Sequence, residues 1–240
     1  MLRNIGVIFA GGTGQRMNTK TKPKQFLELH GKPILVYTLE QFNNHPDIDG
    51  IILVILAGWE EYCWQLKERF HINKLDAVVT GGSTAQESAL IGLRKACELY
   101  QDAIVLIHDG VRPLIDYDTI SKDIESVRQH GSAITVSPAI ETVTIKGENG
   151  EIGQIVERSC CEMARAPQCF YLKDIMEAHL KALNDGNKSF IDSASLMQAY
   201  GHKLYSVIGP SENIKITTPS DFYVFRAIID ARENSQIFGV

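Results

Sequence analysis

The sequence lacks an apolar run long enough to cross a bilayer, and its first residues hold no apolar segment of the length that a secretory signal needs. We therefore expect a cytoplasmic protein with no membrane partner. Cysteine is also scarce, with five residues, and the adjacent Cys160 and Cys161 lack the spacing of a zinc site. We expect reduced thiols with mainly structural roles.

An excess of basic residues is missing too, since 24 Lys and Arg stand against 29 Asp and Glu, for a net charge of −5. A nucleic-acid-binding chain needs basic surface to neutralise phosphates, so we expect no nucleic-acid partner. The 240 residues could form one α/β domain or two small ones, but no Gly-, Ser- or Pro-rich linker divides them. We predict a single domain over 1–240 that acts on small anions.

The most informative stretch begins at Ile5–Ala10, an apolar run that predicts a buried strand. Three glycines within Gly11–Gly14 follow, and they allow backbone N–H groups to converge on one point, as in loops that bind phosphate. Arg16 and Lys24 add positive charge with no carboxylate nearby, and we expect both side chains to project into solvent. The stretch predicts a site for a nucleoside triphosphate.

Two better-known glycine loops do not fit this stretch. A Walker loop ends in Gly-Lys-Ser/Thr, whereas Gln15 and Arg16 follow the last glycine here, and the dinucleotide fingerprint needs a glycine where Met17 stands. A tight turn between a strand and a helix, with solvated basic residues, is the alternative without a binding role. The basic pair favours phosphate binding.

Strands and helices alternate through the first half of the chain. The predicted strands after the first are 50–56, 76–80, 103–107 and 133–136, and the predicted helices are 34–42, 59–70, 85–100 and 116–130. The strand at 50–56 is apolar on both faces, as a strand covered by helices on either side must be. This order predicts a doubly wound α/β fold with a mostly parallel sheet.

Two turns of this fold hold candidate binding residues. Gly81-Gly82 forms a second glycine turn before the helix at 85–100, with Ser88 just inside that helix. Asp109 follows the strand at 103–107 as a lone carboxylate. Doubly wound folds bind ligands at the carboxyl edge of the sheet, so Asp109 is a candidate ligand-binding residue, although it could also be a simple turn residue.

The pattern changes at Thr142–Ile145 and Ile152–Val156, which flank a turn that contains Asn-Gly, a strong hairpin signal. An isolated two-stranded ribbon is marginal in water, so we expect the hairpin to project and to pair with a second subunit. The elements predicted after it are helices at 172–183 and 192–200, strand segments at 204–207 and 213–216, and a closing helix at 222–232.

Several motifs together resemble the cytidylyltransferases that activate sugar-alcohol phosphates, whose members act on 2-C-methyl-D-erythritol 4-phosphate or ribitol 5-phosphate. The likeness covers nearly the whole chain, in order. The motifs are Ala10-Gly-Gly-Thr-Gly-Gln-Arg-Met17, Pro23-Lys-Gln-Phe26, Gly31-Lys-Pro-Ile34, Gly81-Gly82 with Ser88, His108-Asp109 with Arg112-Pro113, and Asn213-Ile-Lys-Ile-Thr-Thr-Pro219.

This resemblance implies a Rossmann-like domain with a β-arm at about 140–160 that forms a homodimer. It implies CMP transfer from CTP to the acceptor phosphate with release of pyrophosphate, and a Mg²⁺ ion held by Asp109. The implied nucleotide-binding residues are Ala10, Gly11, Gly12, Thr13 and Gly14 on the phosphates and Gly82, Ser83 and Ser88 on the cytidine. The implied catalytic residues are Arg16, Lys24 and Lys215, and Arg112, Thr142 and Arg158 would bind the acceptor phosphate, the last two from the partner's arm.

The chemistry requires these residue types, because two anions must meet when a phosphate oxygen attacks the α-phosphorus of CTP in line. Cations and a metal ion offset the repulsion. A phosphate monoester is already ionised near pH 7, so neither a nucleophilic side chain nor a general base is needed. We therefore expect His108 to be structural.

The sequence departs from the family pattern mainly on the acceptor side, at Gln86, Gly110, Ala166 and Ile191, where the family usually has Arg, Ala, Thr and Thr or Ser. The start of the glycine loop is closer to the ribitol-phosphate branch and 192–195 to the methylerythritol branch, so the acceptor stays open. A nucleotide-binding homodimer without turnover, and transfer to a sugar 1-phosphate, are the alternatives.

Overall fold

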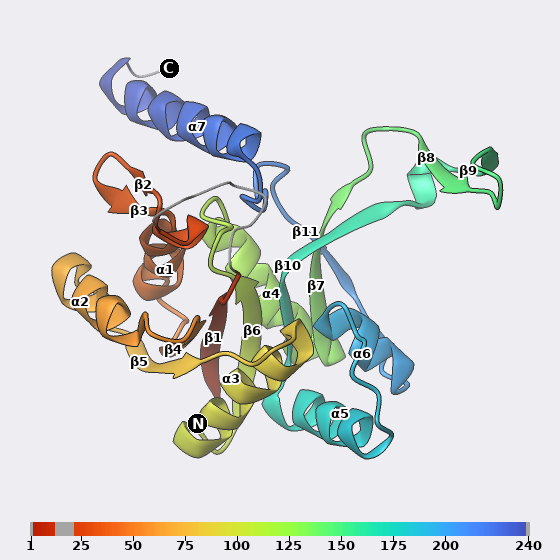
Figure 1. The fold of residues 1–240 in the computed structure, drawn as a ribbon, viewed down its shortest axis with the longest axis horizontal. Coiled ribbons are helices and arrows are strands. Elements are labelled where there is room, and N and C mark those ends of the chain that lie inside the picture. Colours follow the sequence, from red (N-terminus) through yellow and green to blue (C-terminus); the bar gives the residue numbers. More distant parts are fainter. Residues whose placement is uncertain (1, 13–21, 239–240) are drawn as a thin grey trace.

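The computed structural model describes residues 2–12 and 22–238, and its centre is a seven-stranded sheet (Figure 1). The sheet strands are β1 (Arg3–Ala10), β4 (Gly50–Ile55), β5 (Leu75–Thr80), β6 (Ala103–Asp109), β7 (Ser132–Pro138), β10 (Glu162–Tyr171) and β11 (Ser206–Ile208). Their order is β11-β7-β10-β6-β1-β4-β5. Only β10 within this sheet runs antiparallel to its neighbours, so the prediction of a mostly parallel sheet is confirmed.

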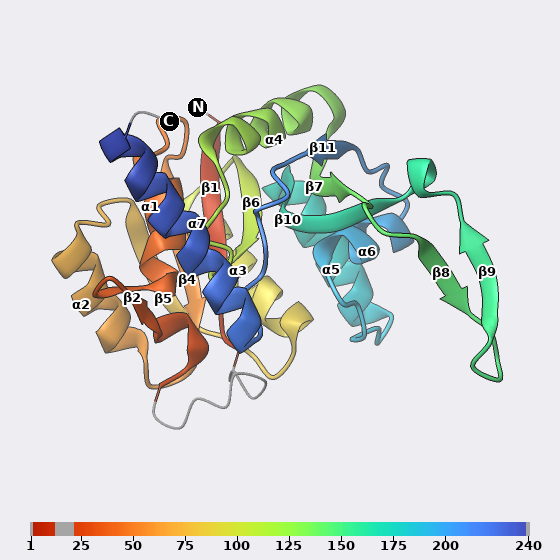
Figure 2. The ribbon, with the colours of Figure 1, turned by 90° about the horizontal axis from the view of Figure 1, so that it is seen from above.

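Helices cover both faces of the sheet (Figures 1 and 2). On one face α1 (Ile34–Asn44), α2 (Glu60–Phe70) and α4 (Tyr117–His130) form an apolar cluster with the strands. On the other face α3 (Ala85–Leu99), α5 (Leu172–Asn184) and α6 (Ser193–Ala199) form a second cluster. Every residue of β4 is buried between the two, which explains its uninterrupted apolar sequence and confirms the doubly wound arrangement.

Polar side chains cap the helices that follow the carboxyl edge of the sheet. Thr84 accepts a hydrogen bond from the N–H of Glu87 at the start of α3, and Asp192 accepts one from the N–H of Ser195 at the start of α6. Such caps satisfy amides that have no partner within the helix. They hold the first turns of α3 and α6 in fixed positions, and both turns border the pocket described below.

The closing helix α7 (Pro219–Phe238) packs against the region of β2 (Glu28–Leu29) and β3 (Lys32–Pro33), a small antiparallel pair that follows the 3-10 turn Lys24–Phe26. Phe225 of α7 is fully buried in a third apolar cluster with Ile34 and Ile216. In the part of the chain that the structure describes, no helix combines the length and apolarity that a bilayer span requires.

The hairpin prediction is confirmed by β8 (Val143–Lys146) and β9 (Ile152–Val156), which pair in antiparallel register. They extend away from the sheet as an arm (Figure 2). Three isoleucines of the arm, Ile145, Ile152 and Ile155, are 52%, 64% and 67% exposed. The arm therefore shows apolar side chains that the described chain does not cover.

The sequence analysis missed β10, which lies between β6 and β7 in the sheet. Pro167 interrupts this stretch and charged residues precede it, a pattern that argues against a central strand. The structure accommodates Pro167 where the pairing with β7 shifts register, between Ala164 and Gln168. The prediction of a strand at 213–216 was also wrong, because this segment has no regular secondary structure. Its carbonyl groups instead accept hydrogen bonds from Lys24 and Arg112, two side chains of the pocket.

Candidate active site

A pocket of about 540 Å³ lies at the carboxyl edge of the sheet, a size typical of small-molecule sites. It gathers residues that are far apart in the sequence, from the glycine loop after β1 to the segment before α7. Of the predicted site residues, those that line it are Ala10, Gly11, Gly12, Lys24, Gly82, Ser83, Ser88, Asp109, Arg112 and Lys215. Thr13, Gly14 and Arg16 lie outside the described residues.

The first wall of the pocket is the end of β1. The carbonyl of Ala10 accepts a hydrogen bond from Nε2 of Gln25, which fixes the loop against the 3-10 turn at 24–26. A Cβ built on Gly11 would meet nothing within 4 Å, and one on Gly12 would come only within 3.7 Å of Cε of Lys24. The backbone at these two glycines is therefore accessible to a ligand.

Lys24 does not project freely into solvent as the sequence analysis expected. Its residue is only 9% exposed, and Nζ donates a hydrogen bond to the carbonyl of Ile216 at 3.0 Å. The side chain still lines the pocket beside Gly12. The hydrogen bond joins the turn at 24–26 to the segment before α7, a contact that no local pattern in the sequence predicts.

The second wall is the glycine turn before α3. The N–H of Gly82 donates to Oγ of Ser88 at 3.1 Å, and the N–H of Ser83 donates to the carboxylate of Glu87 at 2.7 Å. Hydrogen bonds from the side chain and then the backbone of Ser83 lower the pKa of Glu87. A ligand that binds the Ser83 amide must therefore replace the Glu87 carboxylate.

Asp109 is not the lone carboxylate that the sequence analysis expected. Its Oδ2 lies 2.9 Å from Nε of Arg112, and its Oδ1 lies 2.7 Å from Nζ of Lys215. Burial raises the pKa of Asp109, but the charges of Lys215 and Arg112 outweigh this and lower it to about 2. The carboxylate is thus ionised at neutral pH and holds two cations at the mouth of the pocket.

His108, next to this carboxylate, is only 1% exposed, and its Nε2 lies 3.1 Å from the carbonyl of Arg112. Burial lowers its pKa to about 4, so the ring is neutral near pH 7. The ring also packs against Phe42, with centroids 5.2 Å apart. These contacts are those of a structural residue, in agreement with the expectation from the sequence.

The sequence analysis missed Arg165 and Gln168, which β10 brings into the pocket. Arg165 shares a hydrogen-bond acceptor with Arg112, the carbonyl of Asn213, at 2.9 Å from each. Gln168 accepts from the N–H of Ala194 at 2.8 Å and so connects β10 to α6. Gln168 belongs to the segment Ala166-Pro167-Gln168, which matches a Thr-Pro-Gln motif of the family except at Ala166, and this motif could have marked it. Arg165 carries no such signal without knowledge that β10 enters the sheet.

Three of the four positions that depart from the family pattern, Gln86, Ala166 and Ile191, line the same pocket, whereas Gly110 does not. Gln86 bridges α3 to the segment before α6, because its side chain donates to the carbonyl of Asn187 and accepts from the N–H of Phe190. Ala166 is buried, whereas Ile191 is 82% exposed at the rim. Position 191 therefore meets whatever enters the pocket, and it offers no hydroxyl group.

Thr142 and Arg158 do not join this pocket within their own chain. Both are exposed, Thr142 immediately before β8 and Arg158 immediately after the arm. Nη1 of Arg158 donates to the carbonyl of Ile140 at 3.1 Å. The arm directs this region away from the sheet (Figure 2).

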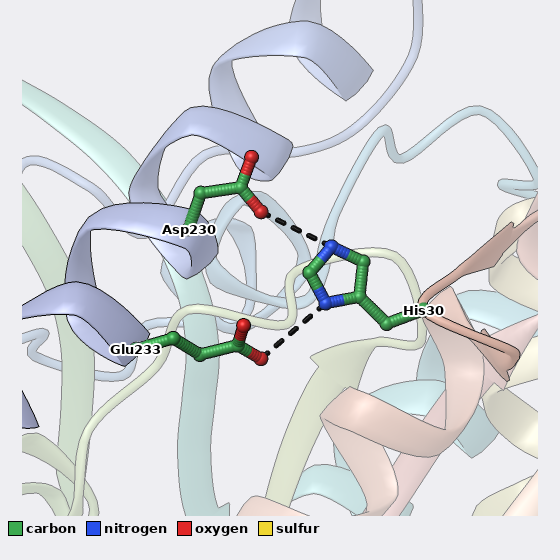
Figure 3. A group of neighbouring side chains, drawn as sticks. All are labelled: His30, Asp230 and Glu233. Atoms are coloured by element: carbon green, nitrogen blue, oxygen red, sulfur yellow. Dashed lines mark hydrogen bonds and ion pairs between the residues drawn. The ribbon is translucent and has the colours of Figure 1, made fainter. Parts of the chain in front are cut away.

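Among the described residues, one group has the spacing of a metal site, and it lies elsewhere. His30 faces Asp230 through Nε2 at 3.1 Å and Glu233 through Nδ1 at 3.3 Å (Figure 3). The two carboxylates contact opposite nitrogens of one ring, whereas a metal ion would need all three side chains to converge on one point. We interpret this group as an anchor between α7 and the β2–β3 turn.

Comparison with known proteins agrees with this geometry. The family model described as IspD, 2-C-methyl-D-erythritol 4-phosphate cytidylyltransferase, matches residues 5–231. A ribitol-5-phosphate cytidylyltransferase of Streptococcus agalactiae serotype V is 51% identical over 240 residues, which cover the whole of both chains. A 2-C-methyl-D-erythritol 4-phosphate cytidylyltransferase of Clostridium botulinum (strain Loch Maree) is 37% identical, and the match covers 96% of this chain and 99% of that protein.

Among solved structures, 4-diphosphocytidyl-2C-methyl-D-erythritol synthase from Anaerococcus prevotii superposes with a TM-score of 0.83 and 28% identity, covering 95% of this chain and 96% of its own. The similarity therefore includes the sheet and both helical layers. The chain belongs to the IspD family, and it is an enzyme that transfers a cytidylyl group from CTP to a sugar-alcohol phosphate.

Proposed function

We propose that ribitol 5-phosphate is the acceptor, so that the enzyme makes CDP-ribitol and pyrophosphate. The observation that carries this proposal is the end-to-end identity of 51% with a protein named for that substrate, against 37% for a relative named for the methylerythritol acceptor. Ile191, exposed at the rim, offers no hydroxyl group to either acceptor, so the proposal rests on the overall identity.

In the proposed mechanism, the backbone at Ala10–Gly14 binds the CTP phosphates, and Arg16, Lys24 and Lys215 stabilise the charge that develops during in-line displacement. Gly82, Ser83 and Ser88 bind the cytidine. Arg112 binds the acceptor phosphate, whose oxygen attacks the α-phosphorus. The acceptor is already ionised, so this chain supplies no general base.

We further propose that Asp109 holds Mg²⁺. Magnesium is commonly bound by one or two carboxylates together with substrate phosphates, and Asp109 is an ionised carboxylate that lines the pocket. Both of its oxygens contact Arg112 or Lys215, so binding of the ion would release at least one of these cations. The ion would neutralise phosphate charge, and the released cation could then contact substrate.

The arm is proposed to form a homodimer, with Thr142 and Arg158 reaching the acceptor site of the partner. Its exposed isoleucines support this proposal, because a hairpin without a core of its own gains stability when such side chains are covered. The pocket of one chain would then be completed by the other. Because CTP and phosphorylated polyols are its substrates, we place the enzyme in the cytoplasm.

A pyrophosphate-release assay tests the proposed acceptor. Wild-type enzyme with CTP and Mg²⁺ would be given ribitol 5-phosphate, 2-C-methyl-D-erythritol 4-phosphate or glucose 1-phosphate, with kcat/KM measured for each. We expect ribitol 5-phosphate to be preferred by at least about tenfold, since a site built to hydrogen-bond the hydroxyl groups of one substrate discriminates against another by that much or more. A preference for the methylerythritol substrate would refute the proposed acceptor.

A further inference from the structure

Arg165 lies in an irregular part of β10. Between Ala164 and Gln168, β10 advances four residues while its partner β7 advances two, from Val136 to Ile134. A bulge of this kind changes the direction of side chains relative to the regular alternation of a strand. Arg165 lies within this bulge and lines the pocket.

Neutral oxygen atoms hold the guanidinium of Arg165. Its Nε donates to Oγ of Ser137 at 2.8 Å, and its Nη1 donates to the carbonyl of Asn213 at 2.9 Å. No carboxylate of the described residues forms an ion pair with it, whereas Arg112 and Lys215 both contact Asp109. Burial, and then the charge of Arg112, lower the pKa of Arg165, as expected for a cation that lacks an anionic partner.

The charges of the pocket do not balance. Among the described residues that line the pocket, the cations are Lys24, Arg112, Arg165 and Lys215 and the carboxylates are Asp109 and Asp192, which leaves two positive charges in excess. A phosphate monoester carries a charge of about −1.5 to −2 near pH 7. One such group would therefore neutralise this excess.

The strand order indicates which substrate brings that phosphate. The glycine loop follows β1, and β6 with Asp109 separates β1 from β10. A triphosphate bound at the glycine loop thus lies on the far side of Asp109 from Arg165. The acceptor is the other phosphate-bearing substrate of the reaction.

We propose that Arg165 determines acceptor specificity by binding the acceptor phosphate together with Arg112. This inference rests on the proposed function and adds a residue to it. The guanidinium groups of Arg112 and Arg165 both donate to the carbonyl of Asn213, so their positions are fixed before the acceptor binds. Together they can donate hydrogen bonds to two oxygens of one phosphate group. An acceptor that lacks a dianionic group would leave Arg165 without an anionic partner, so the pair selects phosphorylated polyols over free ones.

The test uses three variants of the full chain. Arg165→Met keeps the apolar stem and removes the charge. Arg165→Lys keeps the charge but removes the planar guanidinium group with its several N–H donors. Arg128→Met, an exposed arginine of α4, is the matched control. For each, KM is measured for ribitol 5-phosphate and for CTP, together with kcat and the melting temperature.

We expect Arg165→Met to raise KM for the acceptor by at least about tenfold, the effect of losing a charge-assisted hydrogen bond, with KM for CTP unchanged within about twofold. Arg165→Lys should recover part of the loss, and Arg128→Met should behave as wild type. An equal rise in both KM values, or an unchanged acceptor KM with a lower melting temperature, would mean that Arg165 only supports the fold and would overturn the proposal.

Calorimetric titration with inorganic phosphate, without turnover, separates this inference from the proposed function. We expect wild type to bind phosphate and Arg165→Met to bind it at least about tenfold more weakly. This result would stand even if ribitol 5-phosphate were not turned over, in which case only the proposed acceptor fails. Equal phosphate binding by both proteins would show that Arg165 does not contact the phosphate.

Discussion

At the scale of single residues, the charged groups of the pocket hold one another in place before any substrate binds. Asp109 contacts Arg112 and Lys215, and Lys24 donates to the carbonyl of Ile216. In the proposed mechanism, substrate and Mg²⁺ would therefore displace existing partners of these groups. A substitution in this group changes both the chemistry and the fold, and the two effects need separate measurements.

Asp109→Asn should remove most of the Mg²⁺-dependent activity. The pKa of Asp109 in the folded chain, about 2, lies below the ordinary value near 3.9. The ionised carboxylate therefore stabilises the folded state by about 2 kcal/mol above pH 4. This contribution is lost as the pH falls toward 2. We expect the variant to be less stable than wild type by at most this amount at pH 7. Rate against Mg²⁺ concentration and urea unfolding measure the two parts; an unchanged metal dependence would make Asp109 purely structural.

His179 of α5 offers a separate test of stability against pH. It is 2% exposed, neither ring nitrogen has a hydrogen-bond partner among the described residues, and burial lowers its pKa to about 4. As the pH falls from about 6.5 toward 4, the unfolded chain gains a proton that the folded chain excludes, so stability falls, by about 2 kcal/mol at pH 5.

Replacement of this histidine by an apolar residue of similar size should remove that loss. We expect His179→Leu to exceed wild type in free energy of unfolding at pH 5 by more than it does at pH 8, as measured with urea at both values. His108 titrates in the same sense in both proteins, so the difference isolates His179. Parallel loss of stability in the two proteins would contradict the assigned pKa.

At the scale of elements, the arm and the body of the fold are built on different principles. Each helix beside the sheet buries an apolar face, whereas β8 and β9 pair only with each other and leave their isoleucines exposed. We therefore expect changes in the arm to have little effect on the stability of the body, but to weaken the proposed dimer.

Deletion of residues 146–151 should leave the melting temperature of the body nearly unchanged at a concentration where wild type is monomeric. The same deletion should weaken the dimer and raise KM for the acceptor, because the arm would no longer position Arg158. Sedimentation equilibrium and steady-state kinetics measure these effects. A dimer of wild-type affinity after the deletion would show that another surface forms the interface.

At the scale of the whole molecule, the proposed function requires an active site shared by two chains. The prediction is tested by mixing Lys24→Ala chains with Arg158→Ala chains, each of which we expect to be nearly inactive, since a preorganised charge is worth about 3–4 kcal/mol in such sites. In a mixed dimer one site carries both substitutions and the other carries neither. About half of the wild-type activity per mixed dimer should return.

Subunit exchange must be shown independently, for example by energy transfer between labelled chains. If exchange occurs and no activity returns, Arg158 serves its own chain, and the shared-site proposal is wrong. Mixing Lys24→Ala with itself after labelling is the matched control, and it should stay inactive.

Much of the fold follows from short-range patterns in the sequence. The alternation of buried strands and amphipathic helices, the glycine loop after β1 and the Asn-Gly hairpin all depend on residues within a few positions of one another. For that reason their boundaries agree with the structure to within one or two residues over most of the first half. The motifs also identified ten of the thirty residues that line the pocket.

The state of those residues depended on contacts that the sequence does not display. Lys24 donates to the carbonyl of Ile216, which lies 192 residues away, and Arg112 donates to the carbonyl of Asn213 across 101 residues. The entry of β10 between β6 and β7 brings Arg165 to the same carbonyl. Sequence motifs thus identified part of the site, whereas the tertiary structure added Arg165 and decided the partners of every charged group, because packing of distant segments sets burial and the distances between charges.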